Sequence, residues 1–64
     1  MPIIRVEMFS GRTREQKREI AKELTETFIR TAGGKPEGVT ILFCDMEQED
    51  WAVAGQLVAD RTKS

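Results

Sequence analysis

The chain has 64 residues, no histidine and no tyrosine, and its ten Lys and Arg nearly balance its eleven Asp and Glu. The lack of histidine excludes Ser-His-Asp and Cys-His nucleophile pairs and His-ligated zinc, and removes the common proton shuttle of neutral pH. The balanced charge lacks the basic footprint of a nucleic-acid-binding protein, and no apolar stretch reaches the roughly 20 residues of a membrane-spanning helix.

Size and cysteine content limit how this chain can be stabilised. A chain of this length buries only about 60% of the surface that its unfolded form exposes, so a folded monomer is only marginally stable. Cys44 is the only cysteine, so neither an internal disulfide nor a cysteine zinc site can stabilise the fold. We therefore expect one domain over residues 1–64 that self-associates and needs no metal or cofactor. The free thiol and the lack of an export signal predict a cytoplasmic protein.

Pro2 directly follows Met1. Removal of Met1 would leave a secondary amine that the proline ring holds rigidly on the backbone. An α-amine has a reference pKa of about 7.7 to 8.0, and burial or a neighbouring cation lowers this pKa because each disfavours the ammonium form. Such an amine is a candidate proton carrier near neutral pH, whereas a retained Met1 would turn the Pro2 nitrogen into a non-basic amide. Many proteins begin Met-Pro without chemical consequence, and Pro2 alone favours that simpler interpretation.

The segment from Ile3 to Phe9 alternates with a period of two, which predicts a strand. One face is apolar and the other is mixed. The apolar face holds Ile4, Val6 and Met8, and the mixed face holds Ile3, Arg5, Glu7 and Phe9.

A helix is predicted to follow from about Arg14. Thr13 and Gln16 have the spacing of a capping box, in which each side chain satisfies a free amide of the other residue. Apolar residues then recur every four positions, which predicts one amphipathic helix of about five turns. These positions are Ile20, Leu24 and Phe28. Gly33, Gly34 and Pro36 are typical of its end.

Residues 39–44 are nearly all apolar and rich in β-branched side chains, which favours a strand covered on both faces. A strand, a long helix and a second strand within 45 residues form a βαβ unit with parallel strands. One helix covers only one sheet face, so another copy of the chain must cover the other. We predict an acidic loop at 46–50 and a hairpin or arm at 51–55. The fold class is α/β (α+β), a single βαβ unit with a C-terminal hairpin or arm, assembled into a homo-oligomer.

Together, these features resemble the 4-oxalocrotonate tautomerase family over almost the whole chain. The residues that carry the resemblance are Pro2, Ile3, Ile4, the Gly11-Arg12 turn, the helix opening at 13–17, the second apolar strand and the Met46 loop. The resemblance implies βαβ subunits that usually assemble as hexamers. It also implies that the terminal proline acts as general base or acid in keto-enol or double-bond isomerisation of a 2-oxo acid.

The resemblance further implies five site residues. Pro2 moves the proton, and the guanidinium of Arg12 binds a carboxylate or the developing enolate oxygen. Phe9, Trp51 and Val53 form an apolar wall that excludes water and lowers the amine pKa. Taken without the resemblance, Arg12 is a solvated turn residue and Trp51 covers a subunit interface.

The chain departs from the family pattern at Thr40, where the best-known members carry a second arginine donated by a neighbouring subunit. That arginine binds a dicarboxylate, so Thr40 favours a monocarboxylate, an aryl enol-pyruvate or another substrate with a neutral far end. Candidate replacements are Arg5, Lys35 and Arg61. Ala52 and Ala54 replace glycines of the family hairpin, so the pocket mouth is expected to differ.

Other hypotheses remain open. The same proline serves dehalogenases and a decarboxylase, which need an additional carboxylate such as Glu7 or Asp45 to activate water. Alternatively, the chain is a non-catalytic oligomeric assembly module. The acidic residues at 45–50 lack the spacing of a calcium loop and are interpreted as solvated, and Cys44 is interpreted as a small core residue.

Overall fold

The computed structural model describes residues 2–61, so Met1 and its predicted removal lie outside the described residues. The elements run in the order β1 (Ile3–Phe9), α1 (Arg14–Ala32), the 3₁₀ turn η1 (Pro36–Gly38), β2 (Thr40–Met46), the 3₁₀ turn η2 (Gln48–Asp50), β3 (Ala52–Val53), β4 (Gln56–Leu57) and α2 (Val58–Arg61). None of the helices in this part of the chain is long and apolar enough to cross a bilayer.

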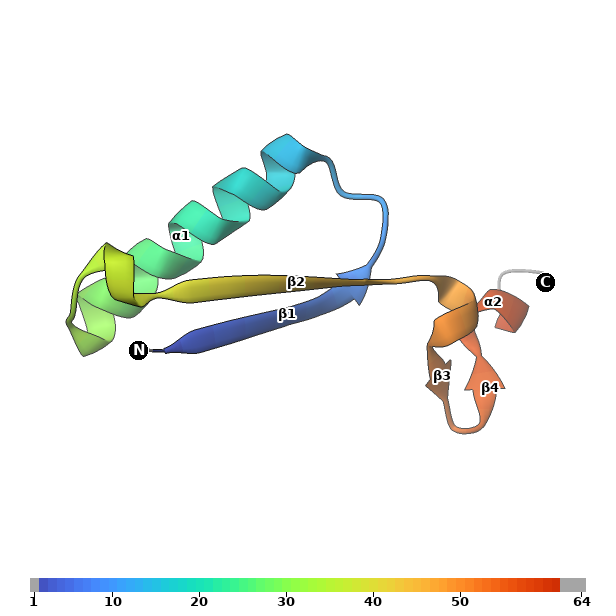
Figure 1. The fold of residues 1–64 in the computed structure, drawn as a ribbon. Helices are drawn as coiled ribbons and strands as arrows, with labels where there is room; N and C mark the ends of the chain where they lie inside the picture. The colour runs from blue at the N-terminus through green and yellow to red at the C-terminus, as the bar shows by residue number, and fades with distance from the viewer. Residues whose placement is uncertain (1, 62–64) are drawn as a thin grey trace.

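The strands β1 and β2 are parallel, with a register that runs from Ile3 opposite Thr40 to Phe9 opposite Met46. Helix α1 lies along one face of this two-stranded sheet (Figure 1), so the predicted βαβ unit and the fold class are confirmed. The predicted bounds of β2 were wrong at both ends. Val39 precedes the strand, and Met46 belongs to it because Met46 pairs with Phe9 and its carbonyl accepts the Ser10 N–H at 2.9 Å.

The capping box of α1 is confirmed. The Thr13 hydroxyl accepts the Gln16 N–H at 3.0 Å, and the Gln16 side-chain oxygen accepts the Thr13 N–H at 2.9 Å. The helix ends at Gly33, whose φ of 85° lies in the left-handed region and whose N–H donates to the Ile29 carbonyl at 2.8 Å. A residue with a Cβ is strained at this φ, which explains why glycine stands here.

Replacing Thr13 with alanine is expected to lower the free energy of unfolding by about 1 kcal/mol, because the Gln16 amide loses its cap. Thermal and urea unfolding at one fixed protein concentration would measure this loss. The matched control is Thr31→Ala, which removes an exposed hydroxyl inside the same helix. Equal stability of the two variants would contradict the capping role.

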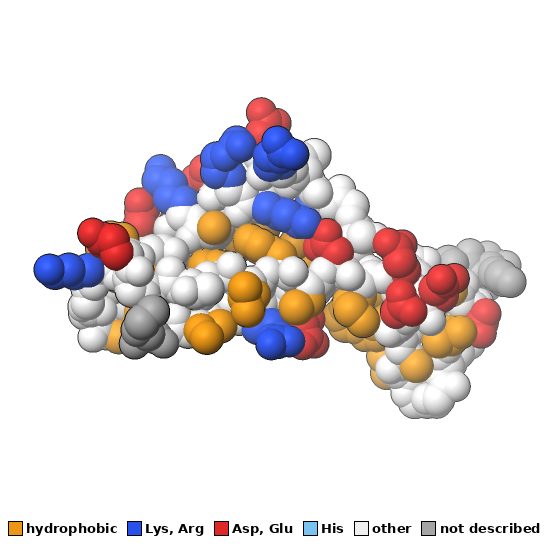
Figure 2. All heavy atoms as spheres, viewed as in Figure 1, with side chains coloured by type: hydrophobic (Ala, Val, Ile, Leu, Met, Phe, Trp, Pro, Cys, Tyr) orange, Lys and Arg blue, Asp and Glu red, His pale blue; other side chains and the backbone are white. Residues whose placement is uncertain are grey.

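The two faces of the sheet differ in what covers them. Under α1, the Lys17 ammonium pairs with the Asp45 carboxylate and lies 5.9 Å from the centroid of the Phe43 ring. The opposite face is uncovered in the chain, with Ile3 65% exposed and Leu42 41% exposed. We call this the open sheet face; its residues are Ile3, Arg5, Glu7, Thr40, Leu42 and Cys44. Figure 2 shows apolar side chains at the surface over the sheet and hairpin, and charged ones gathered on the outside of α1.

Residues 2–61 of a single chain form no hydrophobic core by themselves. Among the described residues, none is buried, and the molecule is 46 Å long with a radius of gyration of 15.2 Å. A compact domain of this length has a radius of gyration of roughly 11 Å. Because exposed apolar surface is unfavourable in water, this shape favours burial of the open sheet face against another chain.

The C-terminal segment is a hairpin, as predicted, followed by an element that was not predicted. Strands β3 and β4 are antiparallel and joined by Ala54 and Gly55, whose φ angles of 56° and 81° are those of a two-residue hairpin turn. The hairpin projects beyond the end of the β1–β2 sheet (Figure 1). The unpredicted element is α2, whose first amide, at Val58, donates to the Trp51 carbonyl at 2.8 Å.

Candidate active site

The predicted site residues lie at two opposite ends of the β1–β2 sheet. Pro2 precedes the first residue of β1, whereas Phe9 ends this strand. Seven strand residues at about 3.3 Å each place these two residues on the order of 23 Å apart. Figure 1 shows the N-terminus at one end of the sheet and the β3–β4 hairpin at the other, and Trp51 directly precedes this hairpin in the chain. A single chain therefore does not bring Pro2 to the predicted apolar wall.

The sheet itself holds Pro2 in place. Its carbonyl accepts the Thr40 N–H at 3.0 Å, which extends the β1–β2 ladder by one residue beyond Ile3. Pro2 is half-buried and Thr40 is exposed. Because the proline ring fixes φ and the ladder fixes the carbonyl, the direction of the Pro2 nitrogen is set by the fold.

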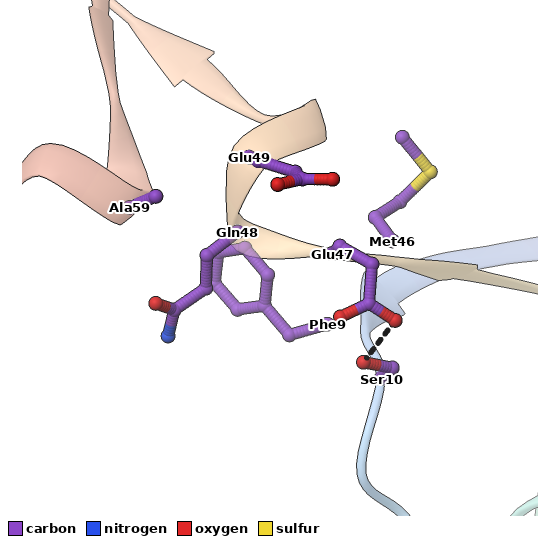
Figure 3. A pocket seen from close by; sticks show the side chains of 7 residues that line it. All are labelled: Phe9, Ser10, Met46, Glu47, Gln48, Glu49 and Ala59. Atoms are coloured by element: carbon purple, nitrogen blue, oxygen red, sulfur yellow. Dashed lines mark hydrogen bonds between the residues drawn. The ribbon is translucent and has the colours of Figure 1, made fainter.

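An open pocket of about 550 Å³ lies at the other end of the sheet. It is lined by Phe9, Ser10, Met46, Glu47, Gln48, Glu49 and Ala59 (Figure 3). The Phe9 ring packs on Trp51 with 4.4 Å between centroids and 43° between planes, a tilted arrangement that aromatic pairs favour. Val53 is 45% exposed on β3 and is not one of the lining residues. The structure thus brings the Phe9 and Trp51 rings into contact, and of the three predicted wall residues only Phe9 lines this pocket.

Ser10 and Glu47 connect the two loops that border this pocket. The Ser10 hydroxyl donates to the Glu47 carboxylate at 2.9 Å, and the Ser10 N–H donates to the Met46 carbonyl at 2.9 Å. Figure 3 shows the Glu47 side chain turned toward Ser10 beside the Phe9 ring. Neither residue was among the predicted site residues, because the contact spans 37 positions of the sequence and no local pattern indicates it.

Arg12 lies two residues after Ser10, in the turn between β1 and α1, and is exposed. Gly11 before it has a φ of 121°, a conformation that favours glycine. Within the part of the chain that the structure describes, the Arg12 side chain has no hydrogen-bond or ion-pair partner. Its guanidinium is therefore available to an anion at the pocket end of the sheet.

The two carboxylates considered for water activation lie away from Pro2 within one chain. Asp45 is on the face covered by α1 and is paired with Lys17. Glu7 is exposed near the middle of the open sheet face. Glu7 is five residues along β1 from Pro2, which corresponds to about 16 Å. A single chain therefore brings neither carboxylate to Pro2, just as it does not bring the apolar wall there.

Comparison with known proteins agrees with this fold. Residues 2–61 match the tautomerase family, described as tautomerase enzyme. The 2-hydroxymuconate tautomerase of Bacillus subtilis (strain 168) is 37% identical over 60 residues, covering 94% of this chain and 97% of the relative. A 4-oxalocrotonate tautomerase isozyme structure from Methylibium petroleiphilum is 40% identical, covers 97% of both chains and has a TM-score of 0.91.

A heterohexamer 4-oxalocrotonate tautomerase from Chloroflexus aurantiacus J-10-fl is 27% identical, covers 94% of this chain and 97% of its own, and has a TM-score of 0.85. These likenesses extend over nearly the full length of each relative and support a tautomerase or isomerase function. The chain belongs to the tautomerase family.

Proposed function

We propose that this protein moves a proton in the enol-keto or double-bond isomerisation of a 2-oxo acid, with Pro2 as general base and acid once Met1 has been removed. The observation that carries the proposal is the fixed position of Pro2 at the sheet end, where the Thr40 N–H anchors its carbonyl. In a chain without histidine, this amine is the group whose ordinary pKa best suits proton transfer near neutral pH. The free thiol of Cys44 suits the reducing cytoplasm.

The proposed reaction needs only one proton carrier. The Pro2 nitrogen accepts the enol O–H proton, the oxygen electron pair forms the C=O bond, and the displaced π electrons take the proton back at carbon. The guanidinium of Arg12 binds the substrate carboxylate by charge-assisted hydrogen bonds. Phe9, Trp51 and Val53 supply the apolar wall that excludes water. No proton is gained or lost overall, so the step requires no cofactor.

We further propose that the site is completed between copies of the chain, in a homo-oligomer that we expect to be a hexamer. Pro2 is too far from the Phe9–Trp51 pair of its own chain to share a substrate with it. Two observations support assembly: none of the described residues is buried in the single chain, and the open sheet face exposes Ile3 and Leu42. A neighbouring copy would place its Pro2 end against this pocket and cover the open sheet face.

The ultraviolet rate of ketonisation tests the proposed function directly. The substrates are 2-hydroxymuconate and phenylenolpyruvate, and intact mass must first confirm that Met1 has been removed. We expect the protein to ketonise at least one enol faster than buffer alone does, because general acid-base catalysis by an oriented amine raises the rate about 10²- to 10⁴-fold. Rates equal to buffer for both enols would reject the proposal and favour the assembly module.

Replacing Arg12 with glutamine is expected to lower kcat/KM about 10- to 100-fold, because the variant loses a charge-assisted hydrogen bond to the substrate carboxylate. Steady-state kinetics on the faster enol would measure this loss. The matched control is Arg14→Gln, which removes an exposed positive charge two residues further along the chain. Equal losses in both variants would show a general electrostatic effect and contradict a specific anchor at Arg12.

A further inference from the structure

We propose that Glu47 is a specificity-determining residue, which makes the pocket selective for substrates with a single carboxylate. In this assignment the Glu47 carboxylate faces the bound substrate and disfavours a second anionic group in the pocket. The inference rests on the proposed function of the site, and it names the substrate class as 2-oxo monoacids and their enols with an uncharged far end.

The charge of the pocket is the first argument. Of the described residues that line it, Glu47 and Glu49 are carboxylates and none is lysine or arginine. Both side chains appear in Figure 3 on the segment that follows β2. A second substrate carboxylate placed here meets the negative charge of both side chains, and no cation lines the pocket to offset it, which disfavours binding.

The second argument is that Glu47 is held in place. Its carboxylate accepts the Ser10 hydroxyl at 2.9 Å, and Ser10 is itself tied to Met46 by a backbone hydrogen bond of 2.9 Å. A free surface carboxylate can turn away from an approaching anion at little cost. The hydrogen bond from Ser10 opposes such a movement, so the repulsion persists when substrate binds.

The third argument concerns the other side of the proposed site, near Pro2. Thr40 lies beside Pro2 there and carries no charge. Arg12 is therefore the one cation among the residues that we assign to the site within the described part of the chain. One cation can neutralise one carboxylate, whereas a dicarboxylate would leave its second charge near Glu47 and Glu49.

Two enols that differ only at the far end test this inference. The diacid is 2-hydroxymuconate, and the monoacid is 2-hydroxy-2,4-pentadienoate, which lacks the second carboxylate. The measured quantity is the ratio of kcat/KM for the diacid to that for the monoacid. We expect Glu47→Gln to raise this ratio on the order of tenfold, since removing one of two like charges at the pocket relieves the repulsion. Glutamine retains the size of the side chain and an oxygen that accepts the Ser10 hydroxyl.

The matched control is Glu26→Gln, which removes an exposed negative charge on α1 and is expected to leave the ratio unchanged. The salt dependence of this ratio is a second measurement, and a purely structural role of Glu47 would not affect it. Raising the salt concentration from about 0.05 M to about 0.5 M should raise the ratio of the wild type, because salt screens the repulsion. The same change should have much less effect on the ratio of Glu47→Gln.

One result would overturn the inference while the proposed function stands. It is Pro2-dependent turnover of both enols with a ratio that Glu47→Gln leaves unchanged. An equal fall in kcat/KM for both enols is one form of this result and would make Glu47 a structural residue. Absence of Pro2-dependent turnover for both enols would instead reject the proposed function together with this inference.

Discussion

Replacing Pro2 with alanine is expected to lower kcat/KM for the preferred enol by at least about 100-fold. Alanine keeps a terminal amine after Met1 removal, but this amine is primary and free to rotate, so the fold no longer aims its electron pair. General acid-base catalysis by an oriented group contributes about 10²- to 10⁴-fold, which sets the scale of the loss. Intact mass of each variant and steady-state kinetics at one pH would measure it.

Two comparisons isolate the amine of Pro2. Pro36→Ala changes the only other proline of the chain, at the start of η1, and should retain activity. Protein that retains Met1 has the same side chains but an amide nitrogen at Pro2, and it should be inactive. In the processed wild type, kcat/KM should fall as the pH is lowered, because the ammonium form cannot accept a proton. Full activity of Pro2→Ala would remove Pro2 from the mechanism.

Replacing Leu42 with glutamate is expected to dissociate the assembly and abolish catalysis together. Leu42 is 41% exposed in the single chain, at the centre of the open sheet face opposite Arg5. Burying a leucine side chain contributes about 1.5 to 3 kcal/mol, and a buried unpaired carboxylate adds a further penalty at every copy of the interface. Catalysis should be lost because, in the proposed assembly, one copy supplies Pro2 and another supplies the pocket.

Light scattering at micromolar concentration would measure the mass of this variant beside its kcat/KM. The matched control is Thr27→Glu, which adds the same charge on the exposed side of α1, three residues before Arg30. The control should keep the wild-type mass and activity. A Leu42→Glu variant that stays assembled and active would show that the open sheet face is not an interface. A monomeric and active wild type would contradict assembly altogether.

The local elements of this chain could be predicted because their determinants lie close together in sequence. The capping box joins Thr13 and Gln16 across three positions, and both of its hydrogen bonds are present. The alternation from Ile3 to Phe9 matched the bounds of β1. The end of β2 was misplaced because Asp45 and Met46 lie outside the apolar run. The pairing of Met46 with Phe9 and the Lys17 ion pair of Asp45 decide where this strand ends.

The contacts that form the pocket could be predicted from the sequence to a lesser extent than the local elements. Phe9 and Trp51 were both expected on the apolar wall, and their rings are in contact although the two residues lie far apart in the sequence. Glu47 was interpreted as part of a solvated acidic loop; it is exposed, and its hydrogen bond to Ser10 also places it at the pocket. Neither contact has a local pattern, since each depends on where two separate loops meet at the end of the sheet.

By itself, the sequence determined the βαβ order and the bounds of α1, because periodicity, capping and apolar content act over a few residues, and its motifs carried the resemblance to the tautomerase family. Only the tertiary structure decided which side chains meet. It showed that Pro2 lies one sheet length away from the Phe9–Trp51 pair, that Asp45 is paired under α1, and that Ser10 holds Glu47. These facts depend on the parallel register of β1 and β2, which sets the distance between the two ends of the sheet and joins residues far apart in the chain.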